Sequence, residues 1–507
     1  MKDGKVKKRG LGANFIYNFI SQVLALIVPL ITTPYLSRVL RETGNGQYSY
    51  ALSIITYFIL FANLGFDIYG QRQIAAYQDD KERKSAAFWE ITALKGIFTA
   101  VSLGVLYAVL FTAGFGESYT PLILILSVQV VIVPLDVQFL FRGDEDFRAI
   151  ALRTIVLRVI TLACIFIFVR RSTDTWLYCL CVSLSAAFSN IVMWPSVFKR
   201  VSCVPLRELK LARHLKPAFL IFLPTLAVTV YSVLDKTMIG LLAENPDYQN
   251  GCYEQAYKIN SVALLLVTLI SSVMVSRNAH EHGAGNAEGV KNNIYFAARY
   301  VWLMGLPLIV GFAVLSPNLC SWFLGEGYAE VPLLLMIMSV RFVVSGLGVV
   351  LGDQLFIATG REKYPTIATA CAAVLNFGLN FWLIPYFGAV GAAITTAVAE
   401  VAVTAVLCIC AAATRSVSVL KIFVSCWKYL LAAAVMFVPV YFMQKYMPYE
   451  IWSFAAITLT GAIVYGVMLI VLRDGLTLKV LKRLSEKLSA RRAGEDKSPD
   501  EQGEDNV

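Results

Sequence analysis

The chain has 507 residues, of which 58% are hydrophobic and only 15% charged, and its mean hydropathy is +0.66. A soluble globular protein carries about 25% charged residues, so this composition excludes a water-soluble fold. The formal net charge of +10 arises mostly from Lys and Arg between apolar segments, so it does not indicate a nucleic-acid partner.

The apolar residues form blocks of about 20 to 27 residues, which is the length that a helix needs to cross a bilayer. Helices satisfy the backbone hydrogen bonds within each segment, as lipid requires. We therefore predict an all-α polytopic membrane protein with about fourteen transmembrane helices. The predicted spans are residues 14–37, 46–69, 86–113, 120–141, 148–169, 176–197, 216–242, 253–275, 294–316, 332–357, 364–384, 388–413, 422–443 and 449–472.

The basic residues between these spans are distributed unequally. With the N-terminus inside, the inside segments hold 31 Lys and Arg and the outside loops hold 5. Inside loops of membrane proteins carry the excess of basic residues. We therefore expect a multi-pass protein of a bacterial cytoplasmic (inner) membrane, with both termini in the cytoplasm.

Two motifs occur twice in the chain. The pattern G-x-Y-x-x-A begins at Gly46 and again at Gly251, 205 residues later, and an Arg follows 26 residues after each glycine. The pattern D-x-x-F-x-x-x-G-x-E begins at Asp136 and again at Asp353. Internal repeats of this kind predict a duplicated structural unit.

The duplication predicts two six-helix lobes of the same orientation, the parallel repeat of some transporters. We expect an N-lobe over residues 1–205 and a C-lobe over residues 206–413. Two additional helices would occupy residues 414–475. Residues 476–507 are charged, show no apolar periodicity, and are expected to form a disordered cytoplasmic tail.

The first helix of each predicted lobe resembles a known family. Residues 29–40 read PLITTPYLSRVL, residues 222–224 read FLP, and residues 234–240 read LDKTMIG. With the two G-x-Y motifs, these segments resemble the Wzx-type polysaccharide flippases, relatives of the MATE exporters and the lipid II flippase. One departure is Arg41, where the resemblance predicts glycine. The resemblance implies translocation of an undecaprenyl-pyrophosphate-linked oligosaccharide between membrane leaflets.

Charged residues inside spans are costly and usually face a protein interior or an aqueous cavity. A surplus of Arg and Lys in such a cavity would suit a pyrophosphate, which both residue types bind well. The candidate cavity residues are Lys95, Arg158, Lys236, Lys258, Arg299 and Arg341. Glu400, in the middle of its span, is a candidate for binding a coupling ion.

Each candidate has an alternative interpretation. Lys95 could pair with an acid on another helix, and Asp235 or Glu254 could neutralise Lys236 and Lys258. Arg158 and Arg299 could extend to the interface instead of lining a cavity. Glu400 could pair with a basic residue and bind no ion.

Polar side chains and prolines add further candidates. Asn14, Asn18 and Gln22 share one face of the first helix and could bind sugar hydroxyls or contact another helix. Pro29, Pro34 and Pro224 interrupt the first helix of each lobe and are candidate hinges. Asp136 and Asp353 are candidate gate residues.

Other functional chemistry has little support. The ten cysteines and three histidines show no metal-ligand spacing, and no phosphate-binding loop of ATPases occurs. We therefore expect neither enzymatic activity nor a cofactor or metal. The expected partners are the lipid-linked glycan, membrane lipids, and a polysaccharide polymerase and glycosyltransferases.

Two alternatives remain at this point. A cation-coupled, MATE-like exporter of small molecules has the same expected architecture, although the resemblance predicts an acid in its first helix and residues 15–37 contain none. A membrane-embedded glycan polymerase or transferase would require a catalytic constellation that the sequence does not indicate.

Overall fold

The computed structural model describes residues 11–113, 116–479 and 482, and throughout these ranges the regular structure is helical. The side chains of residues 11–27, 113, 206, 224, 227, 228 and 231 lie outside this description. Most of the predicted cytoplasmic tail, namely residues 480, 481 and 483–507, also lies outside the described residues.

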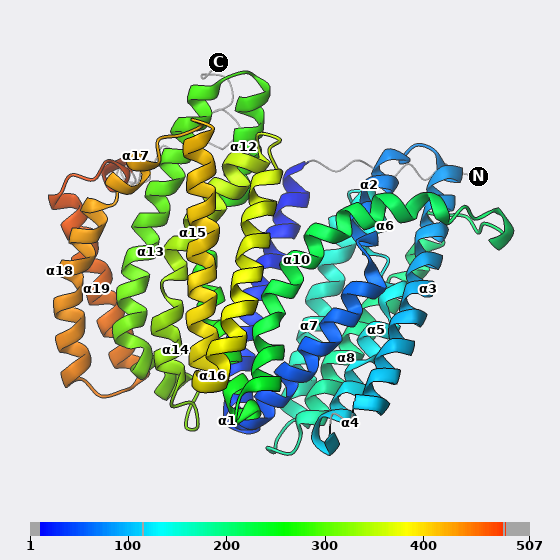
Figure 1. Cartoon of the computed structure of the whole chain (residues 1–507), viewed down its shortest axis with the longest axis horizontal. Coiled ribbons are helices and arrows are strands. Elements are labelled where there is room, and N and C mark those ends of the chain that lie inside the picture. The colour runs from blue at the N-terminus through cyan, green and yellow to red at the C-terminus, as the bar shows by residue number, and fades with distance from the viewer. Residues whose placement is uncertain (1–10, 114–115, 480–481, 483–507) are drawn as a thin grey trace, which may run out of the picture.

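The first half of the chain forms one bundle of helices (Figure 1). Its elements are α1 (Leu11–Asn63), α2 (Phe66–Ala76), α3 (Lys81–Ala113), α4 (Gly116–Leu126), α5 (Val128–Val131), η1 (Val133–Leu135), α6 (Gln138–Gly143), α7 (Phe147–Phe168), α8 (Thr175–Ile191), α9 (Trp194–Val197) and η2 (Leu206–Glu208).

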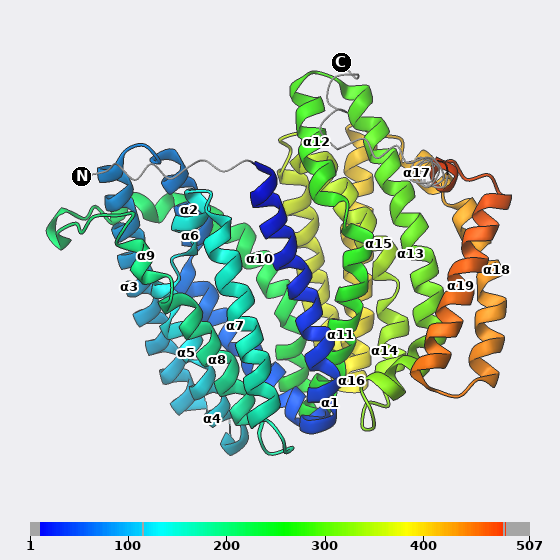
Figure 2. The same cartoon turned by 180° about the vertical axis from the view of Figure 1, so that it is seen from behind.

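The second half forms a bundle beside the first, with α18 and α19 at its far edge (Figures 1 and 2). Its elements are α10 (Ala212–Leu242), α11 (Pro246–Thr268), α12 (Ser271–Gly283), α13 (Ala287–Phe323), α14 (Val331–Met338), α15 (Arg341–Val349), η3 (Val350–Ile357), α16 (Lys363–Ala413), α17 (Val419–Val424), α18 (Trp427–Tyr446) and α19 (Ile451–Val471).

Two of the longest helical segments are hairpins, each broken at a single residue. Arg41 has φ 57° and ψ −171° within α1, and Gly388 has φ 52° and ψ −129° within α16. In Figure 1, α1 runs downward, turns, and returns toward α2 at the upper end. Each hairpin therefore contains two of the helices predicted from the sequence.

The helices have the length and composition of membrane spans. Eleven segments of the described chain are long and apolar enough to cross a bilayer, and two of them contain the breaks at Arg41 and Gly388. Large apolar side chains such as Phe437, Trp452 and Ile463 are exposed on the outer surface, as a lipid solvent allows. The prediction of an all-α polytopic membrane protein is confirmed, and the count of fourteen helices stays a prediction.

The buried apolar side chains form four clusters, three of which lie within one bundle each. The fourth, between Leu60 and Phe222, includes Ala218 and Phe222 of α10 and so packs the start of the second bundle against the first. We refer to the two bundles below as the N-lobe and the C-lobe. The exact lobe boundaries at residues 205 and 413 stay predictions.

The backbone at Arg41 generates a testable prediction. Arg41 lies in a region of positive φ that glycine adopts without steric cost and that costs other residues about 1–3 kcal/mol. We expect Arg41→Gly to raise the melting temperature of the detergent-purified protein, by stabilising the fold by about 1 kcal/mol. Arg148→Gly, at an exposed position within α7, is the control and should lower the melting temperature, because glycine weakens a helix interior.

Candidate functional site

The two lobes approach each other most closely where α1 crosses α11. A Cβ atom added to Gly46 would lie 1.7 Å from the carbonyl oxygen of Asp247, and one added to Gly251 would lie 2.0 Å from the carbonyl oxygen of Glu42. Each glycine thus faces the residue four positions before the other glycine. The absence of a side chain lets the two backbones touch, which explains why both copies of the repeated motif begin with glycine.

Side chains connect the lobes at the same end, which is the lower end in Figure 1. The Asp247 carboxylate accepts a hydrogen bond from Gln47 Nε2 at 2.9 Å and another from the Tyr119 hydroxyl. Asn45 Nδ2 donates to the Tyr328 hydroxyl at 3.1 Å. The N-lobe and C-lobe are therefore in direct polar contact at their lower ends.

The crossing predicts a large effect of a very small substitution. Gly251→Ala places a methyl group against the backbone of Glu42, which cannot move without displacing α1. We expect a destabilisation of about 1–3 kcal/mol, as for other overpacked sites, measured as a lower melting temperature in detergent. Gly466→Ala on α19, where an added Cβ would have no neighbour within 4 Å, should leave the melting temperature unchanged or raise it slightly. Equal melting temperatures for the two variants would contradict the close crossing.

A group of three charges, of which the carboxylate is buried and the two lysines are partly exposed, lies beside this crossing. Glu254 of α11 binds Lys236 of α10 at 2.5 Å and Lys258 at 3.0 Å. The hydroxyl of Ser49, on α1 of the other lobe, donates to Glu254 at 3.2 Å. One carboxylate therefore neutralises two ammonium groups only in part, and the group keeps one net positive charge at the lobe interface.

Arg341, the first residue of α15, belongs to a neighbouring group in the C-lobe. Its guanidinium donates to Asn260 Oδ1 at 3.2 Å and to Glu400 Oε1 at 3.3 Å. The ring of Tyr257 lies 5.2 Å from the Arg341 guanidinium carbon and 5.2 Å from the Lys236 ammonium. Glu400 is thus the partner of Arg341, in line with the alternative that it pairs with a basic residue.

Lys95 is completely buried within the N-lobe. Its ammonium group binds the carboxylate of Asp67, donates to the Asp136 carbonyl oxygen at 3.0 Å, and lies 5.0 Å from the centre of the Phe139 ring. Lys95, Asp67 and Asp136 also line a cavity of about 120 Å³, together with Asn63 and other residues. Lys95 therefore both pairs with another helix and lines a small cavity.

Asp235 has partners that the sequence did not indicate. It accepts hydrogen bonds from Asn380 Nδ2 at 2.6 Å and from the hydroxyls of Tyr253 and Thr396. These bonds come from α11 and α16, and no ion pair involving Asp235 occurs in the part of the chain that the structure describes. The carboxylate next to Lys236 in sequence is therefore stabilised by neutral donors, and Lys236 pairs with Glu254 instead.

Arg158 lies in a second, larger cavity of the N-lobe. This cavity of about 720 Å³ lies between α6, α7 and α8, and Arg142 and Arg153 share its lining. In the sequence, Arg153 lies within the predicted span 148–169 and Arg142 directly follows the predicted span 120–141, and neither is among the predicted cavity residues. Their convergence depends on the packing of α6 against α7, which the spacing of the three residues does not show.

The remaining candidates occupy scattered positions. Arg299 is exposed on α13. Pro29 and Pro34 lie inside α1. Asn14, Asn18 and Gln22 in α1, and Pro224 in α10, have side chains outside the described part of the molecule. A common site formed by all the predicted residues stays a prediction.

The two copies of the aspartate motif have different local structures. Asp136 has an extended backbone before α6, and its carboxylate accepts a hydrogen bond from the Gln138 backbone N–H at 3.0 Å. Asp353 lies within η3, a π-helical segment. The phenylalanines three residues later, Phe139 and Phe356, are both fully buried. The two copies of the motif therefore share a buried phenylalanine, but their aspartates have different surroundings.

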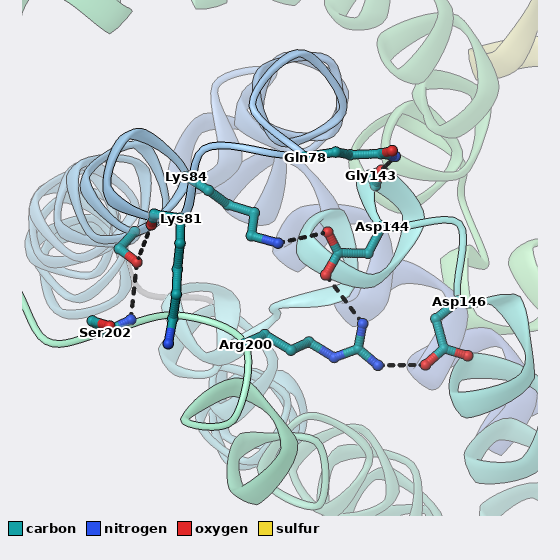
Figure 3. A network of polar contacts seen from close by, with 9 residues as sticks. Gln78, Lys81, Lys84, Gly143, Asp144, Asp146, Arg200 and Ser202 are labelled. Carbon is teal, nitrogen blue, oxygen red and sulfur yellow. Dashed lines mark hydrogen bonds and ion pairs between the residues drawn. The ribbon is translucent and has the colours of Figure 1, made fainter. Parts of the chain in front are cut away.

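A polar network that sequence reasoning missed holds the upper end of the N-lobe together (Figure 3). Arg200 bridges Asp144 at 3.1 Å and Asp146 at 2.5 Å, and Lys84 binds the other oxygen of Asp144 at 3.2 Å. Gln78 donates to the Gly143 carbonyl oxygen at 2.6 Å. Several of these residues are charged and near predicted span ends, but only the fold shows that they meet.

A second missed group attaches the beginning of α10 to the N-lobe. Glu90 of α3, which is 1% exposed, accepts hydrogen bonds from Arg213 Nη2 and from the His214 ring, both at 2.5 Å. His214 also contacts the Tyr69 hydroxyl at 2.9 Å. The first helix of the C-lobe is thereby anchored to the N-lobe at the upper end.

The charge group around Glu254 generates a further prediction. Glu254→Gln keeps the shape of the side chain but leaves two ammonium groups without their shared carboxylate. Removal of one partner from a buried ion pair costs about 3–5 kcal/mol, so we expect a marked fall in the melting temperature. Glu326→Gln, at an exposed position in the loop before α14, is the matched control and should change little. A small effect of Glu254→Gln would show that the two lysines are stabilised in some other way.

The fold places the chain among known transport proteins. It matches the structure of the lipid II flippase MurJ in an inward closed conformation with a TM-score of 0.74, at 15% identity, over 91% of this chain and 99% of that one. A MATE multidrug resistance transporter of the MOP superfamily in an inward-facing conformation matches with a TM-score of 0.59, at 15% identity, over 77% of this chain and 98% of that one. The chain therefore has the fold of the MOP-superfamily transporters.

Sequence comparison identifies the family. The model for polysaccharide biosynthesis proteins matches residues 11–275, and the MatE model matches residues 221–382. The chain thus belongs to the polysaccharide biosynthesis protein family.

Two named relatives are similar to this chain. A protein of Escherichia coli (strain K12) named "Putative O-antigen transporter" is 24% identical over 410 residues, which cover 79% of this chain and 96% of that protein. The "Probable low-salt glycan biosynthesis flippase Agl15" of Haloferax volcanii is 25% identical over 167 residues, 33% of this chain and 35% of that protein.

Proposed function

We propose that this protein is a lipid-linked oligosaccharide flippase, which moves an undecaprenyl-pyrophosphate-linked glycan across the bacterial cytoplasmic membrane for the synthesis of cell-surface polysaccharide. Family membership and the functions named for the relatives support this proposal. The upper end in Figure 1, where α1 begins, would face the cytoplasm. Both termini in the cytoplasm, as expected from the distribution of basic residues, are part of this proposal.

The observation that carries the mechanism is the position of the basic groups relative to the lobe contact. The lobes meet at the crossing of Gly46 and Gly251, and Lys258 follows seven residues after Gly251 on α11, about 10 Å along the helix axis. The partly neutralised group of Lys236, Lys258 and Glu254 thus lies just above the closed end. In alternating access, this contact would be the closed outer gate, and the basic groups would attract the pyrophosphate from the cytoplasmic side.

The proposal includes the environment of the substrate. The polyprenyl tail would remain in the lipid, because moving its apolar surface into a polar cavity is unfavourable. Only the glycan headgroup would cross between the lobes. A glycan polymerase and glycosyltransferases are the expected partners, since they supply and consume such a substrate.

The test is translocation by purified full-length protein in proteoliposomes that carry a fluorescent undecaprenyl-pyrophosphate oligosaccharide. We expect protein-dependent movement, and at least a tenfold slower rate for Lys258→Gln, Lys95→Ala and Arg341→Ala. Loss of Lys258 removes the net positive charge, and loss of Lys95 or Arg341 leaves Asp67 or Glu400 without its partner. Arg171→Gln, at an exposed position in the lower loop between α7 and α8, should translocate at the native rate.

The outcomes separate the competing functions. Movement that none of the three substitutions slows would retain the flippase and refute the role of these basic groups. Movement of an organic cation under a proton or sodium gradient, without movement of the glycan lipid, would replace the proposal with a cation-coupled exporter.

A further inference from the structure

The larger cavity of the N-lobe has an unusual lining. Its walls contain three arginines and four uncharged polar residues, and none of the twelve lining residues is acidic. The polar members of the lining are Gln138, Arg142, Arg153, Thr154, Arg158, Ser185 and Ser189. Its volume of about 720 Å³ lies within the range of about 300–1,000 Å³ that is typical of small-molecule sites.

Two arginines of this cavity are held in place by hydrogen bonds, and one of them, Arg153, has a buried donor without an acceptor among the described residues. Arg153 donates from Nη1 to the Ser189 carbonyl oxygen at 3.0 Å, and Arg142 donates from Nη2 to Gln138 at 3.2 Å. The buried Nε of Arg153 has no hydrogen-bond acceptor in the part of the chain that the structure describes. A buried donor without an acceptor costs about 1–3 kcal/mol, so an external acceptor at this position would be stabilising.

The local field also favours an anion. Arg142 and Arg153 line the same cavity, and their like charges repel each other. Asp136 lies in the wall of the adjacent small cavity, which shares Ala186 with the larger one. The described lining of the larger cavity itself contains three guanidinium groups and no carboxylate, so an oxyanion within the cavity would be surrounded by opposite charge.

The surroundings of the cavity show how such an anion would be carried. Val156 and Ile160 on α7 are 54% and 51% exposed, and Phe188 and Ile191 on α8 are 55% and 50% exposed. These side chains give both flanking helices an apolar outer surface, on which an acyl or prenyl chain can lie. Arg153 and Arg158 follow the first residue of α7 by six and eleven residues, or about 9 and 16 Å along its axis.

We propose that the cavity between α6, α7 and α8 binds the phosphate group of a membrane lipid, with Arg142, Arg153 and Arg158 as the phosphate-binding residues. Guanidinium groups suit this role because their planar arrangement of donors matches two phosphate oxygens at once. The series of arginines runs inward from the upper end of the N-lobe, so a phosphate can enter at Arg142 and move toward Arg158 without losing contact with a cation.

Phosphate on a lipid chain has two possible sources, an anionic phospholipid and the glycan carrier itself. The second source rests on the proposed flippase function, in which this cavity would be a site of substrate entry beside the lobe interface. The first source is independent of that function, because any lipid phosphate of the same leaflet could occupy the cavity.

The experiment is a lipid titration of the purified full-length protein, followed by native mass spectrometry. The probes are undecaprenyl pyrophosphate and phosphatidylglycerol, with phosphatidylcholine as the zwitterionic reference. We expect Arg153→Gln/Arg158→Gln to weaken binding of at least one anionic probe tenfold or more. Arg171→Gln should bind both probes within twofold of the native protein.

A conservative variant separates charge from folding. Arg153→Lys/Arg158→Lys keeps both positive charges but loses the planar donors, so it should recover part of the affinity that the Gln variant loses. The melting temperature of each variant shows whether the fold is intact. A selective loss for undecaprenyl pyrophosphate supports the glycan carrier as the ligand, and an equal loss for phosphatidylglycerol supports a lipid headgroup.

Two results would overturn the phosphate site. One is native-like affinity of the folded Gln variant for both anionic probes, and the other is an equal loss of affinity in the Gln and Lys variants. The translocation assay on the same proteins keeps the two proposals apart. If the Gln variant binds both lipid probes and translocates the glycan lipid like the native protein, the phosphate site is refuted and the flippase is not. If lipid binding depends on the arginines but the native protein translocates no glycan lipid, the flippase is refuted and the phosphate site is not.

Discussion

The backbone contact between α1 and α11 is the constraint on which the arrangement of the two lobes depends. Gly46 and Gly251 each touch the backbone of the opposite helix, at equivalent positions of the two repeats. Such a contact fixes the separation and the rotation of both helices at once, since neither can turn without placing a side chain in the crossing. It therefore determines which residues above it face the other lobe. Ser49 and Glu254, themselves 205 residues apart, meet for this reason.

The sequence predicted the architecture because its signals are local. Apolar segments of sufficient length and a repeated motif each lie on a contiguous stretch of chain, and they were enough to predict a polytopic helical protein with two related lobes. The resemblance placed a glycine after Leu40, where this chain has Arg41. The positive φ of Arg41 explains that expectation, because the hairpin within α1 turns at this residue. The turn of the other hairpin, within α16, does use a glycine, Gly388.

The partners of the buried charges could not be predicted in the same way. Asp235 precedes Lys236 directly in the sequence, yet successive residues on a helix point in different directions. In the folded protein, Lys236 forms an ion pair with Glu254, and Asp235 accepts hydrogen bonds from Tyr253 and Asn380. These partners depend on the rotation of each helix against its neighbours, and no residue spacing within one segment contains that information.

The pairing of these charges changes how a cationic cavity can work. Most of the basic residues singled out in the spans have an acidic partner, such as Asp67 for Lys95 and Glu400 for Arg341. A fully paired cation attracts an anion weakly, because the ligand must compete with a carboxylate already in contact. Positive charge outweighs negative charge in the Lys236–Lys258–Glu254 group at the lobe interface, and among the residues that the structure describes the cavity between α6, α7 and α8 is lined by three arginines and by no acidic residue. In the proposed path, the arginines would meet a pyrophosphate near the upper end of the N-lobe, and the Lys236–Lys258–Glu254 group would meet it just above the closed lower end. Cations that are already in contact with a carboxylate, such as Lys95 and Arg341, would add little to the retention of the pyrophosphate, so its release stays possible.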